Sequence, residues 1–454
     1  MSQTSKAGIS SGRLDPLSYV ENFSDLHPPL SPNKAKIESD RCYFCHDAPC
    51  MEACPTSIDI PLFIREISTD NPDGAADTIF KSNILGGMCA RVCPTETLCE
   101  EVCVHVEQGN LPVKIGELQR FATDHAMETY GQTGGVKFSR AASTGKRICV
   151  VGAGPAGLAC AHRLASNGHD VTILEAKEKS GGLNEYGLAA YKTTNDFAQN
   201  EVEFVLSIGG ITIEHGKALG KDVSVSELTS AYDAVFLGLG LDNTNGLGLD
   251  GEDLAGVYDA VDYISDIRQA DNLADLDVGQ QVVVIGGGMT AIDVAVQVKK
   301  LGARDVTIAY RRGPDQMGAS AFECELAQTN GVVIQHWAAP VELSGDDEKV
   351  RYITLARTQL NDAGKLENTG DTFTLACDQV FKAIGQTFDP SAILGAEIEL
   401  EARRIKIDDD GKTSLEKVWA GGDCVAGGDD LTVSSVEDGN VAAASIDAFL
   451  QANS

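Results

Sequence analysis

Apolar strands and helical stretches alternate along the chain from residue 147 onward. RICVV (147–151) and DVTILE (170–175) are short runs rich in β-branched apolar residues, which predicts two buried strands. PAGLACAHRLASNG (155–168) lies between them and has helical character. The same order recurs in QQVVVIG (280–286), MTAIDVAVQVKKLG (289–302) and DVTIAY (305–310). Each set predicts a βαβ unit of a parallel sheet, so the chain uses one fold twice.

Residues 1 to about 135 lack this alternation and are predicted to form short helices and loops. The segment YGQTGGVKFSRAASTGKR (130–147) is polar and rich in Gly, Ser and Thr, which is typical of a linker before a strand. We therefore predict an α/β fold class. An all-α N-terminal domain precedes two Rossmann-like nucleotide-binding domains.

Length and charge narrow the class of protein. A chain of 454 residues exceeds what one hydrophobic core usually serves, so several domains are expected. The net charge of −31 disfavours nucleic acid and anionic membranes as partners, and a solvated surface explains the acidity better than a docking surface for a basic partner. The start has no cationic segment followed by an apolar one, and no run reaches the roughly 18 apolar residues of a membrane span. We expect a cytoplasmic protein.

Eight of the thirteen cysteines crowd between positions 42 and 103, which in a reducing compartment is more typical of a metal site than of disulfides. The first four form a C-x2-C-x4-C-x3-C-P run, and ferredoxin-like runs send the cysteine before proline to a neighbouring cluster. Two 4Fe-4S clusters are therefore expected. Structural zinc is disfavoured, because zinc pairs usually show two C-x2-C knuckles and this chain has one. The candidates are Cys42, Cys45, Cys50, Cys54, Cys89, Cys93, Cys99 and Cys103.

The first βαβ unit carries a dinucleotide-binding motif. Gly152, Gly154 and Gly157 follow the first strand, and Glu175 ends the second. Glycines allow a tight turn and close approach of a pyrophosphate to the helix N-terminus, while the acid accepts from a ribose hydroxyl. Late in the chain, VWAGGDC places Asp423 after a strand and two glycines. This loop suits a carboxylate that bonds a flavin hydroxyl, but alone it is an ordinary turn.

The second βαβ unit has a related glycine motif, but its second strand does not end in an acidic residue. Gly286 and Gly288 follow its first strand, and Ala291 replaces the third glycine without preventing close packing of helix and strand. No acid ends the next strand; Arg311 and Arg312 follow it instead. An arginine there donates hydrogen bonds to a 2′-phosphate, which indicates NADPH, whereas the alternative is a pair of solvated loop residues.

Longer stretches carry a family resemblance. CYFCHDAPCMEACPTSIDIPLFI, GGMCARVCPTETLCEEVC, KIGELQRFATD, GAGPAGLA, GGGMTAID and AGGDC together resemble the N-terminal half of dihydropyrimidine dehydrogenases. In size the chain is more similar to the separate flavin and iron–sulfur subunit of the bacterial NAD(P)-dependent enzymes. The small subunit of glutamate synthase is a more distant relative. The resemblance covers nearly the whole chain from Arg41 onward.

The resemblance implies a specific set of ligands. One 4Fe-4S cluster would be held by Cys42, Cys45, Cys50 and Cys103, and the other by Cys54, Cys93, Cys99 and Gln119. Cys89 would then bind no iron, although by sequence chemistry alone a thiolate is the better ligand than Gln119. The implied FAD residues are Gly152, Gly154, Pro155, Ala156, Gly157, Glu175, Gly182, Leu183, Lys192, Gly422, Asp423 and Thr432. The implied NAD(P)H residues are Gly286, Gly288, Met289, Thr290, Ala291, Arg311 and Arg312.

Two positions depart from the family pattern. The family usually has Phe-Arg-Leu-Pro after the FAD acid, whereas this chain has Ala-Tyr-Lys-Thr at 190–193. Lys192 is therefore predicted to replace an arginine near the flavin or its phosphates. An expected arginine contact near Gly318 is missing, so NADH use stays open beside NADPH.

The resemblance also implies a function and a domain order. The iron–sulfur domain would span 1–139, the FAD domain 140–243 and 388–454, and the NAD(P)H domain, inserted in it, 244–387. Hydride from NAD(P)H would reach FAD, and single electrons would pass through two clusters to an FMN-containing partner that reduces uracil or thymine. No catalytic acid or base is nominated. The alternatives are a glutamate synthase small subunit or related NADPH reductase, and a non-enzymatic zinc scaffold.

Overall fold

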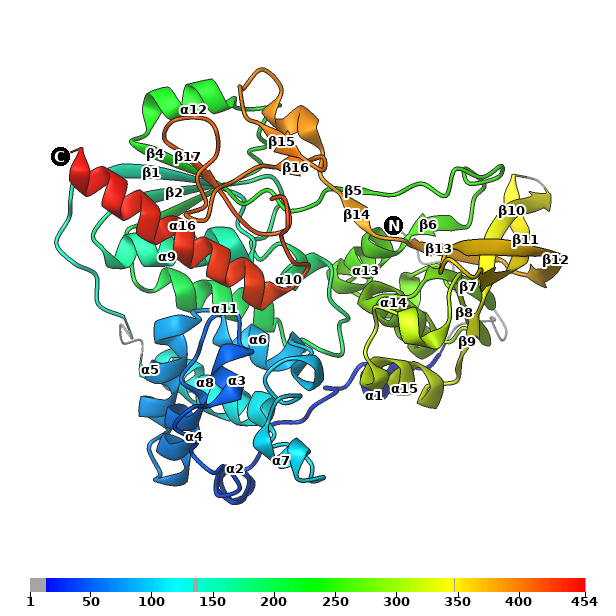
Figure 1. Ribbon diagram of the computed structural model, residues 1–454, viewed down its shortest axis with the longest axis horizontal. Coiled ribbons are helices and arrows are strands. Elements are labelled where there is room, and N and C mark those ends of the chain that lie inside the picture. Colours follow the sequence, from blue (N-terminus) through cyan, green and yellow to red (C-terminus); the bar gives the residue numbers. More distant parts are fainter. Residues whose placement is uncertain (1–13, 134–137, 347, 454) are drawn as a thin grey trace. The chain divides into compact units, whose positions relative to one another are not determined.

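The computed structural model describes residues 14–133, 138–346 and 348–453 (Figure 1). The start of the predicted N-terminal domain (1–13) and residues 134–137 of the predicted linker lie outside this range. By packing, the chain divides into two compact units. Unit 1 comprises Met1–Leu26, Tyr186–Thr194 and Thr244–Gln386, and unit 2 comprises His27–Glu185, Asn195–Asn243 and Thr387–Ser454. The division into three domains stays a prediction.

The N-terminal region is helical, as predicted. Several of its helices begin with Pro in the first turn and a polar side chain that caps the N-terminus, as Asp59 and Asn71 do by accepting from backbone N–H groups. The helices are α1 (Pro16–Asn22), α2 (Pro32–Ser39), α3 (Pro49–Glu52), α4 (Ile60–Ser68), α5 (Pro72–Ser82), α6 (Gly86–Val92), α7 (Val104–Glu107) and α8 (Ile115–Thr133). With 19 residues, α8 is longer than expected.

The FAD-type sheet of unit 2 is parallel throughout, with strand order β17-β4-β1-β2-β3. Its strands are β1 (Arg147–Val151), β2 (Asp170–Glu175), β3 (Ile211–His215), β4 (Ala234–Leu237) and β17 (Val418–Ala420). Its helices are α9 (Pro155–Ser166), α10 (Leu183–Tyr186), α11 (Phe197–Leu206), α12 (Val225–Ala231) and α16 (Thr432–Ala452). The predicted β1, α9 and β2 are confirmed.

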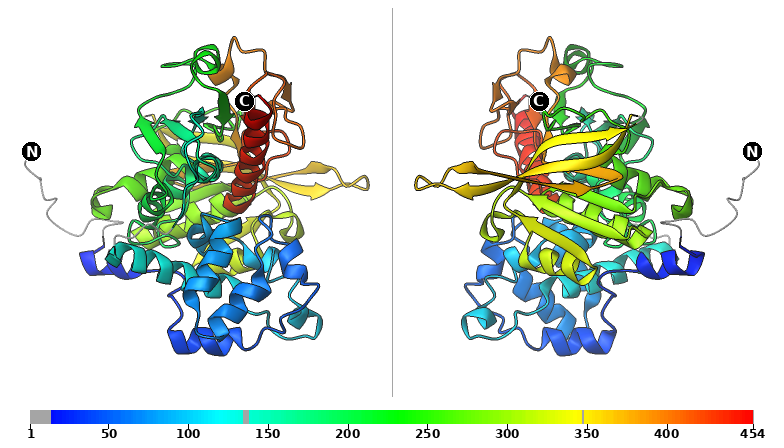
Figure 2. Two further views of the ribbon diagram at one scale, coloured as in Figure 1. Left: turned by 90° about the vertical axis from the view of Figure 1, so that its left-hand side faces the viewer. Right: turned by 90° about the vertical axis from the view of Figure 1, so that its right-hand side faces the viewer.

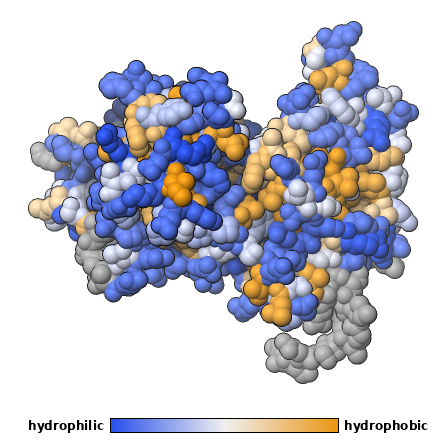
Figure 3. All heavy atoms as spheres, turned by 90° about the horizontal axis from the view of Figure 1, so that it is seen from below, coloured by the Kyte–Doolittle hydropathy of each residue, from blue (hydrophilic) through white to orange (hydrophobic). Residues whose placement is uncertain are grey.

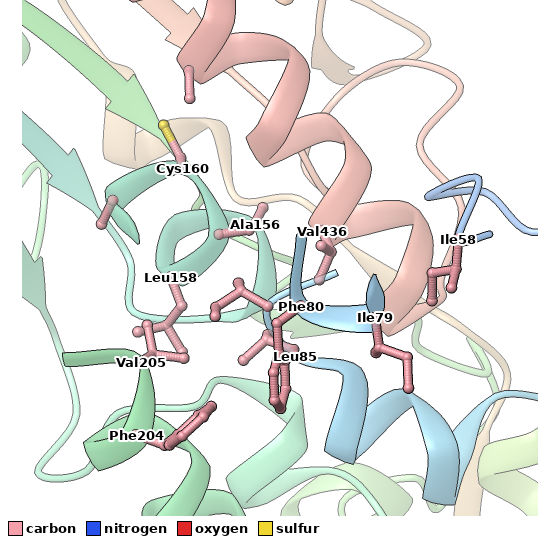
Figure 4. Close-up of a cluster of buried hydrophobic side chains, with 14 of the residues drawn as sticks. Ile58, Ile79, Phe80, Leu85, Ala156, Leu158, Cys160, Phe204, Val205 and Val436 are labelled. Atoms are coloured by element: carbon pink, nitrogen blue, oxygen red, sulfur yellow. The ribbon is translucent and has the colours of Figure 1, made fainter. Parts of the chain in front are cut away.

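One core joins the cysteine-bearing helices to this sheet. Figure 4 shows Phe80 of α5 and the nearby Leu85 beside Leu158 of α9, Phe204 of α11 and Val436 of α16. All five side chains belong to one cluster of buried hydrophobic residues. Because protein interiors are close-packed, the two regions behave as one body, which is why they fall in one unit.

Unit 1 contains a second parallel sheet, of order β6-β13-β7-β8-β9, and an antiparallel sheet, β10-β11-β12. The parallel strands are β6 (Val257–Asp259), β7 (Gln281–Gly286), β8 (Asp305–Tyr310), β9 (Val332–His336) and β13 (Gln379–Ala383), with helices α13 (Ala260–Gln269), α14 (Met289–Leu301) and α15 (Ala321–Thr329). The antiparallel strands are β10 (Ala338–Asp346), β11 (Lys349–Leu360) and β12 (Leu366–Ala376). The β11–β12 hairpin projects from its unit (Figure 2).

Minor elements complete the chain. Four short strands, β5 (Asn243–Thr244), β14 (Gln386–Thr387), β15 (Leu400–Glu401) and β16 (Arg404–Ile405), form two small pairs. On the face drawn in Figure 3, hydrophobic residues stand in small groups among hydrophilic ones. Within the described ranges, no helix combines the length and the apolar character that a membrane crossing requires.

Candidate functional site

Four cysteine thiols surround one cavity in the N-terminal region. Cys42, Cys45 and Cys50 come from the first cysteine run, and Cys103 comes from the end of the second. Apolar side chains complete the lining, among them Ile60, Ile64, Val113 and Ile115. Burial and the neighbouring thiols raise the pKa of Cys50 to about 12. Four thiolate donors in an apolar setting fit a 4Fe-4S cluster, which would relieve this cost because iron binds the deprotonated form.

A second group gathers Cys54, Cys93 and Cys99. The pKa of Cys93 is raised by a hydrogen bond with the Cys89 thiol, by burial, and by the nearby Cys99 and Cys54. Cys89 lies one helical turn before Cys93 on α6 and is buried. The side chain of Gln119, on α8, lies at the N-terminal end of α6. The structure therefore brings together three predicted ligands and leaves both Cys89 and Gln119 at the same helix.

The amide of Gln119 has a defined orientation. Its Nε2 donates to the carbonyl oxygen of Gly86 at 2.7 Å, and the residue is 7% exposed. A carbonyl accepts only, so the amide nitrogen must face Gly86 and Oε1 is left as the acceptor end of the side chain. Among the described residues, no three His, Cys, Asp or Glu side chains form a group that would hold a single metal ion. In a 4Fe-4S cluster each protein ligand instead binds a different iron.

The first glycine motif forms a turn that tolerates no side chain at two of its positions. Gly152 has φ +97°, and a Cβ there would lie 2.2 Å from the carbonyl oxygen of Gly238. A Cβ on Gly157 would lie 1.9 Å from the carbonyl oxygen of Gly152. At Gly154, just before Pro155 and Ala156 of α9, a Cβ would meet only the Cα of Gly182, at 3.8 Å. The space before α9 is thus free, as a bound pyrophosphate requires.

Glu175 ends β2 beside this turn. Its two carboxylate oxygens accept from the backbone N–H groups of Ala153 and Lys177, both at 2.8 Å. A carboxylate has about four acceptor sites, so capacity remains for ribose hydroxyls. Gly182 packs against Gly154, which places the Gly181–Gly182 pair next to the first turn. Leu183 follows it as the first residue of α10.

The late loop reaches the same region through α16. The hydroxyl of Thr432 donates to Asn184 Oδ1 at 2.7 Å and so ties the start of α16 to α10. Gly422 has φ +78°. Asp423 accepts from the Ser435 hydroxyl at 3.3 Å, and burial, with a smaller contribution from a nearby acid, raises its pKa to about 6. The predicted FAD residues from Gly152 to Leu183 and from Gly422 to Thr432 therefore converge.

The second glycine motif repeats this geometry in unit 1. Gly286 ends β7 with φ +148°, Gly288 precedes Met289 and Thr290 of α14, and Ala291 is fully buried. A Cβ on Gly288 would meet nothing within 4 Å. The predicted β7, α14 and β8 are confirmed, and the free space again lies at a helix N-terminus.

Sheet register identifies the residue that replaces the acid. Val151 pairs with Leu174 in the first sheet, and Ile285 pairs with Ala309 in the second. The next residues along β2 and β8 are Glu175 and Tyr310, so an aromatic ring stands where the first unit has its carboxylate. Sequence reasoning found no acid there but missed Tyr310. Its ring packs against Gly287, where a Cβ would lie 2.4 Å from a ring carbon.

Arg311 and Arg312 follow Tyr310. Arg311 is exposed and Arg312 is half-buried. Among the described residues, neither guanidinium group has an acidic or hydrogen-bonding partner, so both are available to an anion. Gly318, where an arginine contact was missing, donates its backbone N–H to the Gly287 carbonyl oxygen at 2.9 Å.

Two long segments of the chain match known protein families. A family model described as pyridine nucleotide-disulphide oxidoreductase matches residues 146–442, more than half of the chain. The chain belongs to the pyridine nucleotide-disulphide oxidoreductase family. A second model, dihydropyrimidine dehydrogenase domain II with a 4Fe-4S cluster, matches residues 19–130, which contain all eight clustered cysteines and Gln119. This match favours the iron–sulfur interpretation over zinc.

Two similar members of the family come from Escherichia coli (strain K12). The NAD-dependent dihydropyrimidine dehydrogenase subunit PreT is 35% identical over 433 residues, which covers 95% of this chain and 98% of that one. The glutamate synthase [NADPH] small chain is 31% identical over 481 residues, 99% of this chain and 100% of that one. This chain is thus an NAD(P)H-dependent flavin oxidoreductase with an iron–sulfur domain.

Solved structures show the fold of the oxidoreductase part. FprA of Mycobacterium tuberculosis in complex with NADPH superposes with a TM-score of 0.58 at 20% identity, covering 68% of this chain and 85% of that one. The thioredoxin reductase of T. acidophilum superposes with a TM-score of 0.54 at 21% identity, covering 68% of this chain and 100% of that one.

Lys192 has two acidic partners in unit 1. It was predicted near the flavin or its phosphates, but its ammonium group lies 2.7 Å from Asp293 and 3.1 Å from Glu323, which belong to α14 and α15 of unit 1. Burial opposes its charge, but the two carboxylates outweigh burial and raise the pKa of Lys192. The side chain neutralises a buried acidic pair, and none of its described contacts supports a flavin role.

Proposed function

We propose that this chain is the electron-input subunit of a dihydropyrimidine dehydrogenase. When bound, FAD would supply two-electron hydride chemistry toward NAD(P)H and one-electron chemistry toward two 4Fe-4S clusters, with the proton of the hydride released. An FMN-containing partner would use these electrons to reduce uracil or thymine to the 5,6-dihydro form. The chain's own residues bind and orient these groups.

One observation carries the proposal. Both cysteine groups and the first glycine turn lie in unit 2 and share one hydrophobic core. A flavin and clusters held on one packed body keep a fixed separation, which electron transfer between them requires. The similarity to PreT over nearly the full length supports the dihydropyrimidine substrate.

The residues proposed for each group combine the geometry of the site with the family resemblance. We assign FAD to the turn at Gly152–Gly157, Glu175, the Gly182–Leu183 segment, and the loop from Gly422 to Thr432. We assign one cluster to Cys42, Cys45, Cys50 and Cys103, and the other to Cys54, Cys93, Cys99 and Gln119. Lys192 is omitted because its charge is already matched by two protein carboxylates.

For the coenzyme we propose NADPH, bound at Gly286–Ala291 with the 2′-phosphate at Arg311 and Arg312. No carboxylate stands at Tyr310 to accept from a free 2′-hydroxyl, which weakens the case for NADH. Arg311→Ala should lower kcat/KM for NADPH about 10- to 100-fold, because a charge-assisted bond is lost, and should change NADH little. Arg304→Ala is the control, since Arg304 precedes β8 at its opposite end. An equal loss with both coenzymes would remove Arg311 from the phosphate site.

The substrate is tested by reconstitution. The purified chain should show flavin peaks on a broad iron–sulfur absorbance, with about eight irons per chain if two 4Fe-4S clusters are present. Mixed with an FMN-containing dihydropyrimidine dehydrogenase subunit, it should oxidise NADPH only when uracil or thymine is added. A colourless protein with stoichiometric zinc would refute the cluster assignment.

The second candidate is the small subunit of a glutamate synthase, which the 31% identity over the whole length of that relative favours. In that case a glutamate synthase large subunit with glutamine and 2-oxoglutarate should drive NADPH oxidation, and uracil should not. This outcome would replace the pyrimidine proposal and leave the flavin and cluster assignments intact.

A further inference from the structure

Trp337 has an unusual backbone conformation beside the coenzyme loop. It lies between β9 and β10 with φ +57°, a left-handed conformation that is uncommon for a bulky residue. Such strain persists only where the surroundings hold it, and it concentrates at functional sites. The contacts of Trp337 therefore indicate which segment of the chain its strained backbone supports.

Trp337 contacts the loop of Arg312 and Gly313 in two ways. Its backbone N–H donates to the Arg312 carbonyl oxygen at 3.1 Å. Its indole covers Gly313, where a Cβ would lie only 2.6 Å from the ring. A residue with a side chain at 313 would displace the indole, so Gly313 and Trp337 form a matched pair.

Thr358 of β11 holds Arg311, the residue before Arg312. Its hydroxyl donates to the Arg311 carbonyl oxygen at 2.8 Å, and its N–H donates to the Trp337 carbonyl oxygen at 3.2 Å. Thr358 is 5% exposed and lies where the pairing of β11 with β12 is irregular. Irregularities of this kind re-aim side chains next to functional sites. Thr358 thus holds the Arg311 carbonyl directly and also bonds Trp337, which holds the Arg312 carbonyl.

We propose that Trp337 and Thr358 are positioning residues that set the preference for NADPH over NADH. This inference rests on the proposed 2′-phosphate site at Arg311 and Arg312. Thr358 fixes the Arg311 carbonyl and Trp337 fixes the Arg312 carbonyl, while both guanidinium groups keep their donors unused among the described residues. A fixed backbone directs the two side chains before the coenzyme arrives, so less ordering entropy is lost on binding.

The smallest test removes one hydroxyl. Dissociation constants of NADP+ and NAD+ are measured by calorimetry on the full-length flavoprotein, so the readout does not depend on turnover. Thr358→Val should weaken NADP+ about fivefold, the effect of one neutral hydrogen bond, and leave NAD+ unchanged. Thr358→Ser keeps the hydroxyl and should bind both as the wild type does. Equal weakening of the two nucleotides, or no change in either, would overturn the proposal.

The second test concerns the indole. Trp337→Ala should weaken NADP+ selectively, and Trp337→Phe, which keeps a ring over Gly313, should restore most of the affinity. Arg311→Ala separates this inference from the function on which it rests. If Arg311→Ala abolishes the preference for NADP+ while Thr358→Val and Trp337→Ala leave it intact, the positioning role is wrong and the phosphate site stands. If Arg311→Ala leaves the preference intact, the phosphate site itself is wrong.

Discussion

Glu201 provides a test of how the FAD-type fold and the cysteine region are joined. It lies on α11, is 1% exposed, and accepts from the backbone N–H of Met88 on α6 at 2.8 Å. Burial raises its pKa from 4.5 to about 8; hydrogen bonds from Met88 and Gly87 and the charge of Arg91 oppose this only in part. The side chain is therefore protonated in the folded protein at neutral pH.

This shift makes stability depend on pH with a definite sign. Between pH 4.5 and about 8 the unfolded chain has lost this proton and the folded chain keeps it. Folding then takes up a proton, so the free energy of unfolding falls as pH rises, by about 1.4 kcal/mol per pH unit. From pH 5.5 to pH 7.5 the loss is about 2.7 kcal/mol by the same relation.

The assay is urea unfolding followed by circular dichroism at pH 5.5, 6.5 and 7.5 for the wild type and Glu201→Gln. Glutamine does not titrate, so the stability of the variant relative to the wild type should rise by about 1.4 kcal/mol per pH unit. All other titrating groups cancel in this difference. Glu203→Gln, at an exposed position of the same helix, should show no such trend. Parallel pH curves for wild type and Glu201→Gln would refute a protonated Glu201.

Three further predictions concern the bound groups and unit 1. Gly157→Ala should destabilise the apoprotein, because the new Cβ meets a carbonyl oxygen at 1.9 Å, whereas Gly154→Ala, which has free space, should spare apoprotein melting and weaken FAD in a binding titration. Gln119→Ala should lower the iron content or alter the EPR signal of one cluster, while Cys89→Ala leaves both clusters as they are; the reverse result would make Cys89 the eighth ligand. Lys192→Met should destabilise unit 1 by about 3–5 kcal/mol in urea unfolding, since two buried carboxylates lose their counter-ion, and an unchanged midpoint would contradict the buried triad.

Features that depend on neighbouring residues could be predicted from the sequence. The strands and helices of both βαβ units follow from apolar patterning, and they agree with the structure within one or two residues. The glycine turns were equally accessible, because the positive φ of Gly152 and the contact of Gly157 with the Gly152 carbonyl belong to the local backbone. The missing acid at the second site was visible as well. That Tyr310 takes its place needed the pairing of β7 with β8.

The grouping of the cysteines was only partly accessible. The spacing predicts metal ligands, but it does not say that Cys103 joins Cys42, Cys45 and Cys50; family resemblance implied this and the shared cavity agrees with it. Thiols far apart in the sequence meet only through the packing of the helices that carry them. The contact of Cys89 with Cys93 is different, because four residues along α6 already make the two side chains neighbours.

The sequence by itself determined the class of fold, the two nucleotide turns and the chemistry of the cysteine region, because hydrophobic period, glycine geometry and ligand type act over a few residues. Only the tertiary structure decided which partners distant residues acquire. Lys192 pairs with Asp293 and Glu323, and Trp337 holds the loop of Arg312, because segments separated in the chain are brought together by burial of their apolar faces. Long-range contacts of this kind follow from how the whole unit packs, and no local pattern encodes them.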